Sequence, residues 1–335
     1  MTTPVLICDD SSVARKQMAK SLPKDWDVEV SFATNGHEAL ELIRQGKGDI
    51  LFLDLNMPEM DGYQVLEEIH RQELPTVVIV VSGDIQPDAR ARVMKMGAME
   101  FIKKPIAPEK LETILRQFGL FDPEPVPEPV SQAVAEAIEQ PVSELEVYQE
   151  IANVAMGQAA DLLARLLDVF VVLPIPRVNL LEVTELQMAL QAAEDRDTYS
   201  AVCQGFIGAG ISGEALLLFH DSSFEDMARL MQYQGEVNEQ VEMELLMDVA
   251  SILIGACIKG IAEQLDVDFS QGHPVVLGQH VDIGELLKNK TWRWKQTLTI
   301  EICYSLEGCN VACDLLLLFT EDSLPILRKK IAYLM

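Results

Sequence analysis

Strand-like and helical patterns alternate regularly through the first 118 residues of the chain. Short apolar runs typical of buried strands occur at 5–8, 28–32, 50–53, 76–81 and 100–102. Helical patterns lie between and after them, at 13–22, 36–45, 62–71, 89–96 and 108–118. Parallel strands need a crossover connection, usually a helix, so this order predicts an α/β fold: a doubly wound sheet of five parallel strands.

Polar residues follow four of these five predicted strands. Asp9 and Asp10 follow the first strand, Asp54 the third, Ser82 the fourth and Lys104 the fifth. In doubly wound sheets the functional site lies at this carboxyl edge. Three carboxylates gathered there would repel one another, and a hard divalent cation such as Mg²⁺ would relieve the repulsion. The lysine supplies a cation for a phosphoryl group, the serine supplies a hydroxyl donor, and the following proline predicts a fixed turn with a cis peptide bond.

The motifs around these residues resemble the receiver domains of two-component response regulators, of the CheY type with a flavodoxin-like fold. The matching segments are Cys8-Asp9-Asp10-Ser11, Asp54 to Gly62, Ser82-Gly83 and Phe101 to Pro105. The resemblance implies that Asp54 accepts a phosphoryl group from a histidine kinase. It implies that Mg²⁺ is held by Asp9, Asp10, Asp54 and the backbone carbonyl of Asn56. It also implies that Ser82 and Lys104 contact the phosphoryl oxygens and that Phe101 turns inward on activation.

A proline-rich linker is expected at 119–142. Proline occupies every second position from Pro123 to Pro129, with glutamate interspersed. Proline at this density prevents a helix and favours the extended polyproline II conformation. The linker is therefore predicted to be a stiff acidic spacer, with a short helix at 131–140.

The second domain, expected at 143–335, contains an internal repeat whose halves span about 143–240 and 241–335. Asn153-Val-Ala-Met-Gly157 recurs as Ser251-Ile-Leu-Ile-Gly255, and the Leu-Leu-Leu-Phe run at 216–219 recurs at 316–319. Strand signals lie at 199–207 and 215–220 in one half, and at 292–306 and 312–320 in the other. Each half alone is small for a core. A pseudo-two-fold α/β domain is expected, with two long helices on an antiparallel sheet.

The first half opens on a predicted helix at 143–167. Ser143 and Glu146 form the capping box that typically starts a helix. Apolar residues at helical spacing, from Leu145 through Leu162 to Leu166, predict one buried face. Glu150 and Asn153 lie side by side on the other face. Considered alone, this helix could simply present them to solvent.

The spacing of Asn153 and the second-half Ser251 from later prolines gives the helix a more specific interpretation. Twenty-two residues separate Asn153 from Pro176, and the same number separates Ser251 from Pro274. This pattern, Glu-x2-Asn-x22-Pro, resembles that of the CheC/CheX/FliY family of CheY-phosphate phosphatases. The resemblance implies that Glu150 and Asn153 are catalytic. A carboxamide can orient a water molecule toward an aspartyl-phosphate, and a neighbouring carboxylate can pair with the lysine of the substrate receiver.

The second copy departs from this pattern. Asp248 replaces the glutamate and Ser251 replaces the asparagine. Each side chain is shorter, by about 1.5 Å, and a misplacement of about 1 Å can cost roughly a hundredfold in rate. The second site is therefore predicted to be degenerate, with a structural role or weak docking.

Charge and cysteine content narrow the classes of partner. The chain carries 26 basic and 53 acidic residues, a net charge of −27. Nucleic acid and anionic membranes both require a basic surface, so neither is expected as a partner. The six cysteines form no CxxC pair, which favours reduced thiols over a metal site. With no apolar run of 18 residues and no basic leader, the protein is expected to be cytoplasmic.

The sequence therefore predicts a response regulator whose output domain is a CheC-like protein aspartyl-phosphate phosphatase. Its partners would be a histidine kinase as phosphodonor and a phosphorylated CheY-like receiver as substrate, in trans or on its own Asp54. Phosphorylation of Asp54 would modulate the activity. The alternative is a non-catalytic interaction module in chemotaxis or flagellar signalling, switched by the receiver. The kinase, the substrate receiver, the sign of regulation and the presence of a homodimer are left open.

Overall fold

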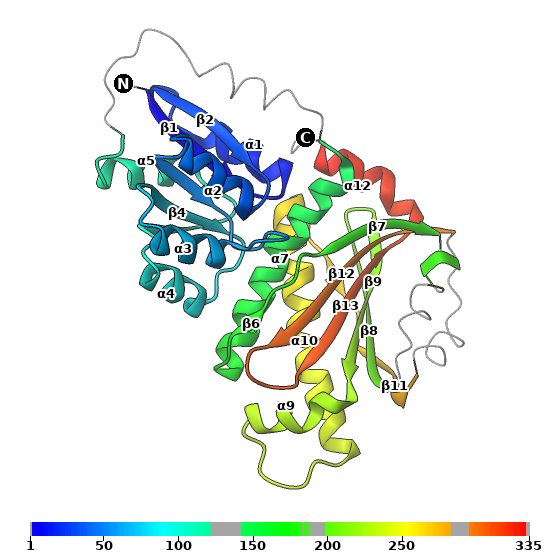
Figure 1. Ribbon diagram of the computed structural model, residues 1–335. Coiled ribbons are helices and arrows are strands. Elements are labelled where there is room, and N and C mark those ends of the chain that lie inside the picture. Colours follow the sequence, from blue (N-terminus) through cyan, green and yellow to red (C-terminus); the bar gives the residue numbers. More distant parts are fainter. Residues whose placement is uncertain are drawn as a thin grey trace. The chain divides into compact units, whose positions relative to one another are not determined.

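A computed structural model describes residues 2–121, 142–182, 184–186, 188, 198–282 and 295–332 (Figure 1). The chain divides into two compact units, of which the first ends at Glu150 and the second begins at Ile151. This division falls inside helix α7 (Glu144–Leu167), and the predicted domain boundary at 143 lies just before that helix begins. Most of the predicted linker, including its short helix at 131–140, lies outside the described residues.

The first unit contains a five-stranded parallel sheet in the order β2-β1-β3-β4-β5. The strands are β1 (Thr3–Cys8), β2 (Val28–Ala33), β3 (Ile50–Leu53), β4 (Val77–Ser82) and β5 (Glu100–Lys103). The helices are α1 (Ser12–Ser21), α2 (Gly36–Arg44), α3 (Gly62–Arg71), α4 (Pro87–Lys95) and α5 (Pro108–Gln117). The predicted α/β class and parallel sheet are confirmed.

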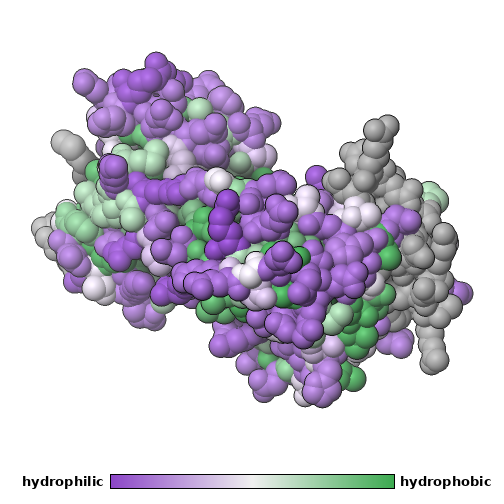
Figure 2. Space-filling view, turned by 90° about the horizontal axis from the view of Figure 1, so that it is seen from below, coloured by the Kyte–Doolittle hydropathy of each residue, from purple (hydrophilic) through white to green (hydrophobic). Residues whose placement is uncertain are grey.

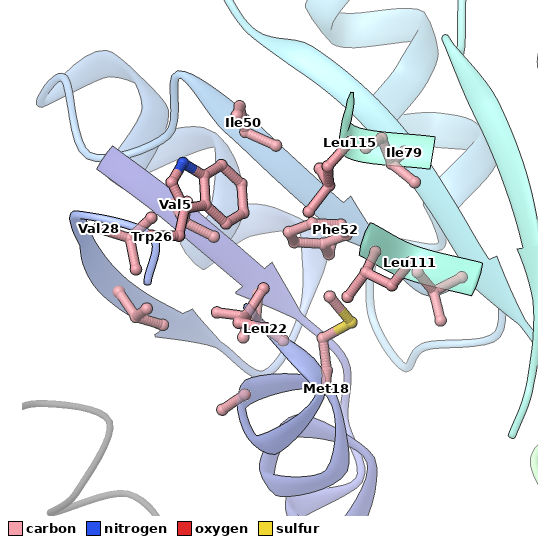
Figure 3. Close-up of a cluster of buried hydrophobic side chains, with 14 of the residues drawn as sticks. Val5, Met18, Leu22, Trp26, Val28, Ile50, Phe52, Ile79, Leu111 and Leu115 are labelled. Atoms are coloured by element: carbon pink, nitrogen blue, oxygen red, sulfur yellow. The ribbon is translucent and has the colours of Figure 1, made fainter. Parts of the chain in front are cut away.

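Two apolar clusters cover the two faces of this sheet. One joins β-strand residues such as Val5 and Phe52 to Met18 of α1 and Leu111 of α5 (Figure 3). The other joins the opposite strand faces to α2, α3 and α4. Because helices cover both faces, every residue of β3 is buried, which explains why its sequence is a continuous apolar run and not an alternating one.

The second unit is an antiparallel sheet with two long helices, as predicted. After α7 come β6 (Val171–Val172), β7 (Arg177–Glu182), β8 (Tyr199–Gly208), β9 (Ile211–His220), a 3₁₀ turn η1 (Asp221–Ser223) and α9 (Phe224–Leu230). Next come α10 (Glu239–Leu265), β10 (Ser270–Gln271), β11 (Val275–Val281), β12 (Gln296–Leu306), β13 (Ala312–Phe319), η2 (Glu321–Ser323) and α12 (Leu324–Ile331). The main strand order is β10-β8-β9-β13-β12-β6, with β11 also paired to β8 and β7 to β12.

The two halves of this unit exchange their edge strands. β6 and β7, from the first half, pair with β12 of the second. β10 and β11, from the second half, pair with β8 of the first. Pro176 and Pro274 stand immediately before β7 and β11, where a proline lacking an N–H group is tolerated at the start of an edge strand.

Matching hydrogen bonds also link the halves. The Ser223 hydroxyl accepts from the amide of Ala312 at 3.1 Å, and the Ser323 hydroxyl accepts from the amide of Ser212 at 2.8 Å. The two bonds correspond through the 100-residue repeat: Ser323 is the counterpart of Ser223, and Ala312 is the counterpart of Ser212. The serine hydroxyl belongs to the first half in one bond and to the second half in the other. Each serine joins the start of a short helical segment to a strand of the other half, so the halves form a single sheet and core.

Helices α7 and α10 approach closely where the middle of α7 meets the C-terminal part of α10. A Cβ atom on Gly260 would lie 2.8 Å from the Cα of Ala155, so this crossing requires a glycine. One turn further, Gln264 donates to the carbonyl of Ile151 at 2.8 Å. The predicted apolar face of α7 is only partly correct, because Leu145, Leu162 and Leu166 are 40%, 51% and 50% exposed.

Helix α10 is long and apolar enough to cross a membrane, although no apolar run of 18 residues was expected. Of its most apolar 18 residues, 67% are buried inside the protein, and the core helix of a globular domain has the same length and composition. Figure 2 shows a surface that is mostly hydrophilic in the view drawn, with smaller hydrophobic areas. All six cysteines are free thiols, as predicted.

His280 lies between two carboxylates in the second unit. Its Nδ1 is 3.0 Å from Asp221 Oδ2 and its Nε2 is 3.0 Å from Glu242 Oε2. Partial burial lowers the pKa of His280, but the hydrogen bond to Asp221 and the charges of both carboxylates outweigh it and raise the pKa above 6.5. A raised histidine pKa contributes stability below the unfolded-state value, and this stability is lost as the pH rises through the folded-state value.

We therefore expect β11 and the first turn of α10 to open more readily as the pH rises from 6 to 9. The increase in opening should be roughly twofold to fivefold, the effect of a half-exposed ion pair. Hydrogen exchange, corrected for its intrinsic pH dependence, measures the opening. His280→Asn should remove the pH dependence while tolerating the left-handed backbone at φ 54°. The exposed His273 provides the control, His273→Asn, and equal pH dependence in both variants would contradict the assignment.

Candidate functional site

Asp54 lies at the carboxyl end of the central strand β3. Its amide donates to the carbonyl of Cys8 at 2.9 Å, which aligns the ends of β1 and β3. Its side chain is buried, and Oδ2 accepts from the amide of Asn56 at 2.8 Å. The sheet thus presents one carboxylate at its edge with a backbone donor already in place.

Lys104 joins Asp54 to Asp9. Its Nζ is 3.0 Å from Asp54 Oδ1 and 2.7 Å from Asp9 Oδ2. Its amide donates to the carbonyl of Ser82 at 2.9 Å, which continues the β4–β5 pairing beyond the last strand residue. The Lys104–Pro105 peptide bond is cis, as predicted.

The site carries more negative than positive charge. Burial, together with the nearby charge of Asp54, raises the pKa of the Asp10 carboxyl to about 7. Burial and Asp54 also raise the pKa of Asp9, against the opposing effect of Lys104. Although burial opposes it, the pKa of Lys104 is raised by Asp54 and Asp9, so the lysine is a cation. One ammonium therefore faces three carboxylates.

The donor set fits Mg²⁺ in its chemistry. Hard oxygen ligands at an edge with surplus negative charge suit this ion, which usually binds through one or two carboxylates and keeps several waters. Across the described residues, no three His, Cys, Asp or Glu side chains already form a compact metal cage. The Lys104 ammonium pairs with two of the candidate ligands. The residues that could hold the ion are Asp9, Asp10, Asp54 and the Asn56 carbonyl.

Ser82 lies at the end of β4 and is buried. Its hydroxyl accepts from the amide of Asp84 at 3.1 Å, and the Asp84 carboxylate accepts from the amide of Gln86 at 3.0 Å. This hydrogen-bonded loop leads from the site to the start of α4. Phe101, on β5, is partly buried and packs against the α2–α4 side of the sheet. The structure therefore brings Ser82 to the site edge and places Phe101 on a neighbouring face.

Two further residues shape the site. The sequence did not point to Arg15, and it gave Gly62 only as part of a motif, without a role. Arg15, in the second turn of α1, donates to the carbonyls of Asp9 and Asp10. The sequence feature that could have indicated Arg15 is an arginine one turn into the helix that follows the acidic pair. Gly62 begins α3, and a Cβ there would collide with the Asp54 carbonyl oxygen, so only glycine allows α3 to start this close to the site.

The candidate residues of the second domain lie on α7 and α10. Glu150 and Asn153 occupy successive turns of α7, which begins with the predicted capping box between Ser143 and Glu146. Asp248 and Ser251 occupy the corresponding positions of α10 and are exposed. The Ser251 hydroxyl donates to the carbonyl of Met247 at 2.7 Å, so its hydrogen is used by its own helix.

Sequence comparison identifies known relatives. The model of the response regulator receiver domain matches residues 5–116. A protein-glutamate methylesterase/protein-glutamine glutaminase of Geobacter sulfurreducens is 38% identical over 102 residues, 30% of this chain and 27% of that protein. One from Archaeoglobus fulgidus is 39% identical over 103 residues, 30% of this chain and 29% of that protein. The chain thus spans less than a third of the length of either relative.

Solved structures were also matched. FliY of Thermotoga maritima aligns with 59% of this chain and all of that chain, at 16% identity and a TM-score of 0.44. The response regulator domain of Thermotoga maritima CheB aligns with 37% of this chain and all of that chain, at 32% identity and a TM-score of 0.32. The family match at residues 5–116 coincides with the parallel sheet that carries Asp9, Asp54 and Lys104. The N-terminal part of this chain is therefore a response regulator receiver domain.

Proposed function

We propose that the chain is a response regulator whose second domain hydrolyses the aspartyl-phosphate of a receiver. The observation that carries the proposal is the asymmetry between two corresponding helices. Both are followed by a proline that immediately precedes an edge strand, but only α7 carries the acid–amide pair, Glu150 and Asn153. This pair, at this spacing, is the one expected from the resemblance to the CheC/CheX/FliY phosphatases. The substrate would be a separate CheY-like receiver or the chain's own Asp54.

In the receiver, Asp54 would be the phosphoryl acceptor. Its carboxylate oxygen would bond to phosphorus as the bond to the phosphodonor nitrogen of a histidine kinase breaks. Lys104, already paired with Asp54, and the Ser82 hydroxyl would contact the phosphoryl oxygens. Mg²⁺, held by Asp9, Asp10, Asp54 and the Asn56 carbonyl, would neutralise phosphoryl charge. Positioning and charge stabilisation supply most of the catalysis in such transfers.

In the second domain, the Asn153 carboxamide would hold a water molecule in line with the substrate's phosphorus. As the water oxygen bonds to phosphorus, the bond to the aspartate oxygen breaks, releasing phosphate and restoring the carboxylate. Glu150 would pair with the substrate receiver's lysine, the counterpart of Lys104. A neutral amide suits the task because it accepts from the water without needing to change its protonation state.

The proposed second-copy residues lack this chemistry. Ser251 has no amide and its hydroxyl hydrogen is engaged with Met247. Asp248 is shorter than the glutamate it replaces. We assign this face a structural or weak docking role, with the single active site on α7.

The direct test is the rate at which a separate, purified phospho-receiver loses its phosphate. Adding the full chain in catalytic amounts should speed the loss, with several turnovers per chain. Binding of the phospho-receiver without any acceleration would instead indicate a non-catalytic interaction module.

Phosphorylation of the chain's own receiver is expected to raise this activity. Phosphorylation would rearrange the receiver around Ser82 and Phe101. Because the receiver is joined to the second domain, a switch between two receiver conformations can change the activity of that domain. A shift of about 1.4 kcal/mol in such an equilibrium corresponds to a tenfold change. Hydrolysis of a separate phospho-receiver should therefore accelerate when beryllofluoride, a phosphate mimic, loads Asp54.

The control for this activation is Asp54→Asn, which should not respond to beryllofluoride at its own receiver. Equal rates with and without the mimic in the wild type would rule activation out. Loss of phosphate from Asp54 itself that is faster in wild type than in Asn153→Ala, and independent of protein concentration, would show that the receiver is a substrate in cis.

A further inference from the structure

Arg15 fastens the backbone of the acidic pair at the site. It lies in the second turn of α1, and its Nη1 donates to the Asp9 carbonyl at 2.6 Å and to the Asp10 carbonyl at 3.0 Å. α1 is itself fixed at this end, because the Ser11 hydroxyl caps it by accepting from the amide of Ala14 at 3.1 Å. A rigid helix thus reaches back to two successive peptide groups of the loop that precedes it.

The two acidic side chains differ in how they are held. The Asp9 carboxylate accepts from the Ser11 amide at 2.9 Å and pairs with Lys104 at 2.7 Å. No ion pair of this kind is found for Asp10 within the described part of the chain. The direction of the Asp10 side chain therefore depends on its backbone, and Arg15 is the side chain that holds that backbone.

We propose that Arg15 is a positioning residue for the divalent cation: it fixes the Asp9–Asp10 peptide groups so that both carboxylates face the ion. Groups that orient metal ligands typically contribute tenfold to a hundredfold to metal affinity. This inference rests on the proposed Mg²⁺ site. It adds a residue that contacts neither the ion nor the phosphoryl group.

The direction in which Mg²⁺ affinity changes when Arg15 is removed distinguishes a positioning role from a purely electrostatic one. Arg15 is a cation close to a cation site, so its long-range charge weakens Mg²⁺ binding. If charge were its only role, removing it would tighten binding. If it positions the ligands, removing it will weaken binding despite the more favourable electrostatics.

The experiment is a calorimetric titration of the full chain with Mg²⁺ alone, without a phosphodonor. We expect Arg15→Met to raise the Mg²⁺ dissociation constant about tenfold. Arg15→Lys, which keeps the charge but loses the forked guanidinium, should also weaken binding. The matched control is Arg44→Met. Arg44 is the last residue of α2, away from the site, and its guanidinium is hydrogen-bonded to the side chain of Gln72, so this substitution should leave the Mg²⁺ dissociation constant unchanged.

A second readout removes ambiguity about folding. The thermal midpoint of the receiver without Mg²⁺ reports the structural cost of each substitution, and the rise on adding Mg²⁺ reports binding. Arg15→Met should show a smaller rise than Arg44→Met. Unchanged or tighter Mg²⁺ binding in both Arg15 variants would overturn the inference. Absence of Mg²⁺ binding in the wild type would instead overturn the proposed metal site itself.

Discussion

Asp54→Asn should abolish phosphorylation of the receiver by a histidine kinase or by small phosphodonors. The amide that replaces the carboxylate is a far weaker nucleophile. Among the residues that the structure describes, no other carboxylate lies at the end of β3 with the Asn56 amide as donor and Lys104 beside it. The expected effect is complete loss of label. The measurement is incorporation of phosphate into wild type and variant under identical conditions.

The fold should survive this substitution, because asparagine has nearly the same shape and can still accept from the Asn56 amide. A thermal midpoint close to that of the wild type would confirm this. Stable label on Asp54→Asn, lost only when another carboxylate is changed, would show that Asp54 is not the acceptor. Labelling of the wild type should also require Mg²⁺, so undiminished labelling in excess chelator would contradict the metal assignment.

Asn153→Ala should lower the proposed phosphatase activity by roughly tenfold to a thousandfold, as expected when a water-positioning group is lost. The loss should fall on kcat more than on KM, because the amide would act on the attacking water and Glu150 would carry the docking contact. The measurement is the rate of phosphate loss from a separate phospho-receiver over a range of substrate concentrations.

Ser251→Ala is the matched control, since Ser251 is the counterpart of Asn153 on α10. Its hydroxyl already bonds to Met247, so its removal should change the rate by less than about twofold. Equal losses in the two variants would show that both faces are active and that the second copy is not degenerate.

Much of the receiver could be predicted from the sequence because local and global signals agree there. Its strands are continuous apolar runs, and its helices begin at capping residues such as Ser11, Asn35 and Asp61. Residues at the ends of parallel strands must meet at one edge, so Asp9, Asp54 and Lys104 were expected together. Their geometry was not expected, because the chain order does not reveal that the lysine pairs with two carboxylates at once.

In the second domain, some strands and the exposure of some apolar residues could not be predicted from the sequence. No strand was predicted at β7 or β11. Both are edge strands in which polar and apolar residues alternate over a few positions at most, and each follows a proline. The exposure of Leu162 and Leu166 could not be predicted either. Helical periodicity gives a face, but only tertiary packing decides how far along the helix that face stays covered. Arg15 was missed because its role is a contact to backbone, which side-chain motifs do not record.

The exchange of edge strands in the second domain has an evolutionary consequence. Each half completes the sheet of the other, so neither can be deleted after duplication without leaving unpaired strands and an exposed core. Selection for folding would therefore retain a half whose catalytic residues have decayed. Under the proposed function, such a half would be free to change its surface residues, and the face with Asp248 and Ser251 is where a new specificity would arise without loss of the proposed activity of α7.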